Sequence, residues 1–61
     1  MNMNYGEIKV KLATDSIGYS EILKEYRKLE KKQWIYNHYD FEMELKDLED
    51  LMSEALEKGL Y

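Results

Sequence analysis

The fold is decided by residues 40–59, which read DFEMELKDLEDLMSEALEKG. Apolar residues recur there at steps of three and four, the spacing of a helix that packs on one face. Asp40 suits the N-cap, because its carboxylate can accept from free N–H groups of the first turn. Gly59 suits the left-handed residue beyond the last turn, with Leu60 as the accompanying hydrophobic contact. This stretch therefore predicts an amphipathic helix over about 40–58.

The opposite side of this predicted helix carries a line of carboxylates at steps of three, four and three. We call it the acidic ridge, and its members are Asp47, Asp50, Glu54 and Glu57. That spacing places neighbouring side chains about 5–6 Å apart on one face. The ridge is either a solvated face that keeps the protein soluble or a surface that docks on a basic partner.

A second helix is expected over about 20–36, with Ser20 as its N-cap. The residues of its inward stripe recur at steps of four, three, four and three: Ile22, Tyr26, Leu29, Gln33 and Tyr36. Basic residues gather on its back: Lys24, Arg27, Lys28 and Lys31. They form either a solvated face or a face that binds phosphates or acidic groups. With a short turn after it, this helix forms an antiparallel hairpin with the helix over 40–58.

The segment between the two helices loses its period and is rich in aromatic residues. We call its apolar members the aromatic elbow: Trp34, Ile35, Tyr36, Tyr39 and Phe41. Such residues either complete the core or form a binding hot spot. The sequence leaves both interpretations open.

The N-terminal third contains an alternating pattern, YGEIKVKL over residues 5–12. Ile8, Val10 and Leu12 alternate with charged residues, which predicts a half-buried strand over about 6–12. A single strand needs a pairing partner at its edge. The expected fold is therefore α+β and mostly α, with one short strand before the helical hairpin, completed by a dimer mate or another protein.

Length and composition favour one small domain over residues 1–61 whose core is too small to be stable without another protein. A chain of 61 residues buries only about 60% of its unfolded surface. The sequence has no Cys, so no disulfide can stabilise it and no thiolate can hold a metal. We therefore expect a homodimer or a partner that completes the core.

Charge and hydropathy narrow the environment of the protein. The net charge is −4 and the pI about 4.9, which argues against direct binding to nucleic acid or to anionic membranes. Residues 1–19 are neutral, residues 20–39 carry +2 and residues 40–61 carry −6. No apolar run is long enough for a membrane span or a signal peptide, so the cytoplasm is the expected compartment.

The pattern of polar residues does not favour catalysis. His38 is the single histidine, and the carboxylates lack the spacing of a metal loop. No Ser, Thr or Cys is placed to form an activated nucleophile with His38 and Asp40. We expect neither a cofactor nor a metal, and no enzymatic activity.

The leading functional hypothesis is a small acidic protein-binding module that inhibits or modulates a larger, possibly nucleic-acid-binding, protein. In composition the chain resembles compact acidic inhibitors from phages and mobile elements that act on host defence systems. A row of carboxylates could there mimic nucleic-acid phosphates. A structural or assembly subunit is an alternative that the sequence does not separate from this one.

Another alternative comes from the expected order of strand, helix and helix. That order resembles the ribbon-helix-helix family of dimeric DNA-binding regulators and antitoxins, as do the outward residues Glu7, Lys9 and Lys11. The resemblance implies paired strands in the major groove and a phosphate at the N-terminus of the second helix. Asp40, Glu42 and Glu44 depart from that pattern, since they would repel a phosphate.

Overall fold

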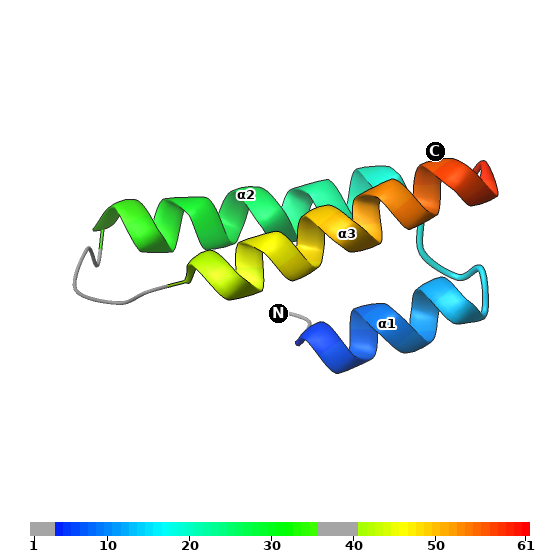
Figure 1. Ribbon diagram of the computed structural model, residues 1–61, viewed down its shortest axis with the longest axis horizontal. Coiled ribbons are helices and arrows are strands. Elements are labelled where there is room, and N and C mark those ends of the chain that lie inside the picture. The colour runs from blue at the N-terminus through cyan, green and yellow to red at the C-terminus, as the bar shows by residue number, and fades with distance from the viewer. Residues whose placement is uncertain (1–3, 36–40) are drawn as a thin grey trace.

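The computed structural model describes residues 4–35 and 41–61, and these residues form three α-helices. They are α1 (Tyr5–Ala13), α2 (Tyr19–Ile35) and α3 (Glu42–Lys58). Helices α2 and α3 run antiparallel and side by side, while the shorter α1 lies along α3 (Figure 1). The molecule measures about 35 × 20 × 15 Å.

The predicted N-terminal strand is wrong, and with it the α+β fold class, because residues 5–13 are helical. Asn4 caps this helix: its side-chain oxygen accepts from the Glu7 backbone N–H at 2.8 Å. Ile8 and Leu12 are each 1% exposed and lie one helical turn apart, whereas Val10 between them is 64% exposed. These three residues are therefore not a strand-pairing edge. Among residues 4–35 and 41–61 the fold is all-α.

Helix α2 begins at Tyr19, one residue before the expected start, and Ser20 is not its N-cap. The Tyr19 N–H donates to the carbonyl oxygen of Leu60 at 2.6 Å, so the C-terminal segment supplies an acceptor at this helix end. Further along, Ile22 is buried and the rest of the stripe is half-buried: Tyr26, Leu29 and Gln33. Tyr36, the last predicted member of the stripe, lies outside the described residues.

Helix α3 begins at Glu42 and has a well-formed end. Asp40 lies outside the described residues, and the N-cap position belongs to Phe41, which makes no side-chain capping bond. At the other end Gly59 has φ 79°, as its expected left-handed role requires. The Gly59 N–H donates to Leu56 at 3.1 Å and the Leu60 N–H donates to Ala55 at 2.8 Å. These two bonds form a Schellman motif, and Leu60 packs against the core as predicted.

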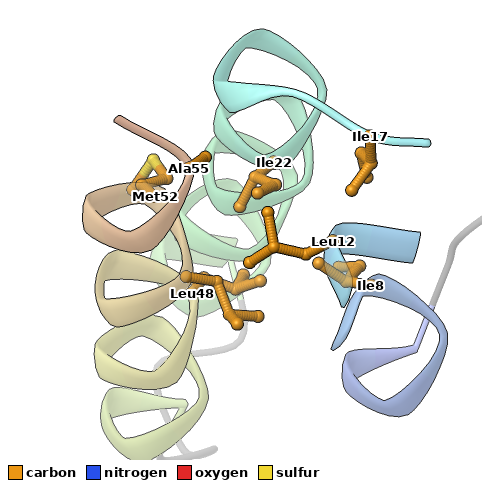
Figure 2. Close-up of a cluster of buried hydrophobic side chains, with 8 residues drawn as sticks. Ile8, Leu12, Ile17, Ile22, Leu48, Met52 and Ala55 are labelled. Carbon is orange, nitrogen blue, oxygen red and sulfur yellow. The ribbon is translucent and has the colours of Figure 1, made fainter. Parts of the chain in front are cut away.

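The core lies where the three helices meet. Its buried residues are Ile8, Leu12, Ile17, Ile22, Leu48, Leu51, Met52 and Ala55. Figure 2 shows Leu12 of α1 between Ile22 of α2 and Leu48 of α3. The ammonium group of Lys58 donates to the Leu12 carbonyl oxygen at 3.2 Å and so fastens α1 to the end of α3.

Candidate functional site

The acidic ridge lies on the side of α3 that faces away from the core. Asp50, Glu54 and Glu57 are exposed and Asp47 is half-buried. Within the described part of the chain, none of the four carboxylates takes part in a hydrogen bond or an ion pair. The buried residues of α3 fix this orientation, because they occupy a different arc of the helix, which approaches the ridge only at Asp47. The ridge is thus an uncompensated line of negative charge on a rigid helix.

Met43 extends this line and was not predicted as a site residue. It lies four residues before Asp47, which places it on the same face of α3, and it is 78% exposed. An exposed methionine at the end of a carboxylate row adds an adaptable apolar contact. The spacing of four from Asp47 is the sequence signal that could have identified it.

The basic residues on the back of α2 are all exposed: Lys24, Arg27, Lys28 and Lys31. Lys28 pairs with Glu25 at 3.4 Å, one turn earlier on the same helix. The other three have no ion-pair partner among residues 4–35 and 41–61. The two long helices therefore present opposite charges on their outer faces.

The described part of the aromatic elbow is largely solvent-accessible. Trp34 is 84% exposed and Ile35 53% exposed, whereas Phe41 is half-buried. Tyr36 and Tyr39, the other predicted members, lie outside the described residues. The end of α2 and the start of α3 occupy the same end of the hairpin (Figure 1). Trp34, Ile35 and Met43 thus expose apolar surface at that end rather than completing the core.

A cleft of about 230 Å³ opens where the three helices diverge. Its apolar wall includes Ile8, Leu29 and Leu48, and its rim carries charges of both signs, such as Lys32 and Glu44. Among the described residues no group of three or more His, Asp or Glu side chains could hold a metal ion. The cleft therefore offers an apolar surface with a mixed ionic rim.

One polar contact joins α2 to α3 beside the core. The Tyr26 hydroxyl donates to a carboxylate oxygen of Glu49 at 3.2 Å. Partial burial of the phenol, followed by the negative charge of Glu49, raises the pKa of Tyr26 above its usual 10.0. Glu49 thus marks the side of α3 that meets α2, and the acidic ridge lies roughly 80–160° around the helix from it.

No protein-family model matches the sequence, and no curated protein or solved structure shows a significant similarity to it. Within the described ranges, none of the helices combines the length and the apolar character needed to cross a membrane.

Proposed function

We propose that this protein is a non-enzymatic binding module and that its acidic ridge docks on a basic surface of a larger protein. The proposal rests on the arrangement of the ridge carboxylates and on their lack of ion-pair partners. They lie in one row, and no cation in the described part of the chain neutralises them. A helix face of this kind is complementary to a row of Lys and Arg side chains.

Repulsion between the ridge carboxylates has an energetic cost, and no ion pair among the described residues offsets it. Like charges one turn apart destabilise a helix by about 0.2–0.5 kcal/mol per pair. The nearest basic group at the end of α3, Lys58, instead contacts the Leu12 carbonyl oxygen and pairs with Asp15 at 3.7 Å. A basic partner would offset this repulsion on binding, which supports a docking role.

Apolar residues at one end of the hairpin complement the charged row. Trp34 and Met43 are among the most exposed large apolar residues of the described chain. Aromatic residues and methionine are enriched in the central part of protein interfaces. In the proposal the ridge orients the approach, and these side chains supply the apolar contact.

A basic surface that normally holds nucleic-acid phosphates is a suitable partner, because a row of carboxylates can compete for it. This favours an inhibitor or modulator of a nucleic-acid-binding protein. An assembly subunit is the second candidate, favoured by the opposite charges on the outer faces of α2 and α3. The ribbon-helix-helix alternative is not retained, since residues 5–13 form a helix and not the strand on which it depended.

The test begins by capturing the partner from the native host and then measures its association rate against two matched triple variants. The ridge variant is Asp50→Asn, Glu54→Gln and Glu57→Gln. The control variant is Glu7→Gln, Glu21→Gln and Glu30→Gln, which removes three exposed carboxylates elsewhere. Both sets of changes take the net charge from −4 to −1, so the variants have the same net charge and differ in where the carboxylates are removed.

We expect the ridge variant to associate with the partner roughly 10-fold or more slowly than the control variant. We also expect the association rate of the wild type to fall as the salt concentration rises. Equal rates for the two variants would show that the position of the charges is irrelevant, and the docking role of the ridge would be wrong. Circular dichroism of both variants checks that α3 remains helical.

A further inference from the structure

The outer faces of α2 and α3 carry complementary stripes with the same spacing. On α2 we define the basic stripe as Lys24, Lys28 and Lys31, and Ile35 follows it on the same face. Their steps are four, three and four. On α3, Met43, Asp47, Asp50 and Glu54 also follow steps of four, three and four. This step pattern reads the same in both directions, so the two stripes match when the helices run antiparallel.

In that antiparallel register every position of one stripe meets a complementary position of the other. The opposed pairs are Lys24 with Glu54, Lys28 with Asp50, Lys31 with Asp47, and Ile35 with Met43. The axial spacings are about 6, 4.5 and 6 Å on both helices. Three pairs are therefore ionic, and the fourth joins two exposed apolar side chains, 53% and 78% accessible.

The two stripes cannot meet within one molecule. Ile22 is the buried residue of α2, and Lys24 and Lys31 lie about 180–200° around the helix from it. On α3, the side that meets α2 carries Glu49, and the ridge lies on the far side. The stripes thus point in opposite directions from the hairpin, and each remains open to another molecule.

We infer that the protein associates with itself head to tail, the basic stripe of one copy packing antiparallel on the acidic ridge of the next. This inference rests on the proposed docking role of the ridge and names a second copy as an occupant. The two surfaces differ and face opposite ways, so the contact is heterologous and leaves one free surface at each end. It therefore produces an open series of oligomers or a ring rather than a closed dimer.

Three features of the contact limit its strength. A single helix pair buries less area than the roughly 1,200–2,000 Å² of stable complexes, so association is weak and needs concentrated protein. Glu21 falls opposite Glu57 in the same register, which adds one repulsive pair at the edge. To pair with Asp50 of the next copy, Lys28 must also give up or share its ion pair with Glu25, in which the nitrogen–oxygen distance is 3.4 Å.

The test is sedimentation equilibrium of the full chain at roughly millimolar protein, in about 10 mM and about 1 M salt, where the Debye lengths are about 30 and 3 Å. We expect the average mass of the wild type to rise above 7.4 kDa with concentration at low salt and to return toward it at high salt. A wild type that stays at 7.4 kDa at low salt overturns the inference.

Charge reversal then locates the contact. The stripe variant carries Lys24→Glu, Lys28→Glu and Lys31→Glu, and a reversed-ridge variant carries Asp47→Lys, Asp50→Lys and Glu54→Lys. Each alone should remain at 7.4 kDa, whereas their equimolar mixture should associate again, because each then offers the opposite charge to the other. A mixture that stays monomeric overturns the inference.

Two further variants separate this contact from net charge and from folding defects. The control Lys9→Glu, Lys32→Glu and Lys46→Glu shares the stripe variant's change of six charge units, from −4 to −10, at exposed positions off the stripe. It should associate more than the stripe variant, and equal loss in both overturns the inference. Glu21→Lys turns the repulsive edge pair into an attractive one, so association should strengthen; unchanged or weaker association overturns the register.

Binding to a larger partner distinguishes this inference from the proposed function. The stripe variant retains the complete ridge and is more negative than wild type, so it should lose self-association while its association rate with the captured basic partner does not fall below that of wild type. Partner binding that survives while the wild type never self-associates refutes only the head-to-tail contact. Loss of the ridge dependence in partner binding refutes the proposed function itself.

Discussion

The backbone N–H of Tyr19 lies 2.6 Å from the carbonyl oxygen of Leu60, joining the first residue of α2 to the segment that follows α3. Leu60 reaches this position because Gly59 turns the chain through a left-handed conformation. The Leu60 oxygen accepts from one of the N–H groups that a helix N-terminus leaves unpaired. The hairpin is therefore closed at this end by backbone contacts rather than by a side-chain cap.

Replacing Gly59 should weaken this closure. Gly59→Ala places a Cβ on a residue with φ 79°, where no neighbouring atom lies within 4 Å, so its cost is backbone strain alone. We expect a loss of about 1–2 kcal/mol in the free energy of unfolding, or roughly 4–8 °C in Tm for each kcal/mol. Ser53→Ala, at an exposed site within α3, is the control and should not lower Tm. Equal melting curves for the two variants would contradict this account.

The orientation of α3 can be tested at its centre. Leu48 is 6% exposed and contributes to the core, whereas Asp50 is exposed on the ridge. Leu48→Ala should reduce the free energy of unfolding by about 2–5 kcal/mol, which is a large part of the stability of a small domain. Asp50→Ala should change it by less than about 0.5 kcal/mol. Thermal melts that do not separate the two variants would show that α3 is rotated differently.

Two substitutions at Val10 distinguish helix from strand in the N-terminal segment. Val10 is 64% exposed, so Val10→Ala should preserve stability or raise it slightly through better helix propensity. Val10→Pro should cost about 3 kcal/mol, because proline removes a helical hydrogen bond and clashes with the preceding turn. Far-UV circular dichroism should show less helix for the proline variant only. Equal helix content in both would contradict a helix over residues 5–13.

Because of the contact between Tyr26 and Glu49, the free energy of unfolding should depend on pH in the alkaline range. The pKa of Tyr26 is raised in the folded protein by partial burial and by Glu49, so the unfolded chain loses this proton first. The contribution is fully present below about pH 10 and is lost as pH rises through the folded pKa. Urea titrations from about pH 9 to pH 11 should show a steeper loss of stability for wild type than for Tyr26→Phe. Parallel profiles would exclude Tyr26 as the source.

The sequence predicted the long helices better than the short one. The end of α3 was correct because Gly59 and Leu60 form a local signal that needs no tertiary contact. The first segment was wrong because Ile8 and Leu12, four residues apart, fit both a strand and a helix face. Only Val10 distinguishes the two, and its exposure depends on where α3 lies. Asn4 was the missed local signal, since its side chain caps the helix.

For the candidate surfaces too, features set by one helix could be predicted from the sequence, whereas features set by tertiary packing could not. The ridge could be predicted from spacing alone, because every member lies on one helix. The exposure of Trp34 could not be predicted. Whether a tryptophan at the end of a helix packs onto the core depends on tertiary packing and not on its neighbours in sequence. Ile17 is a similar case: it lies in the segment between α1 and α2, outside any helix, yet it is 3% exposed because this segment folds back onto the core.

The position of Trp34 also determines how this protein can be observed by fluorescence. It is the single tryptophan of the chain, and 84% of it contacts solvent in the folded state. Indole emission should consequently resemble that of a hydrated tryptophan both before and after unfolding, so it is a poor measure of the folding transition. A molecule that covers this end of α2 would transfer the ring to an apolar environment and shift the emission to shorter wavelength. Trp34 fluorescence should therefore report the binding of another molecule at this end of α2, while changing little when the protein unfolds.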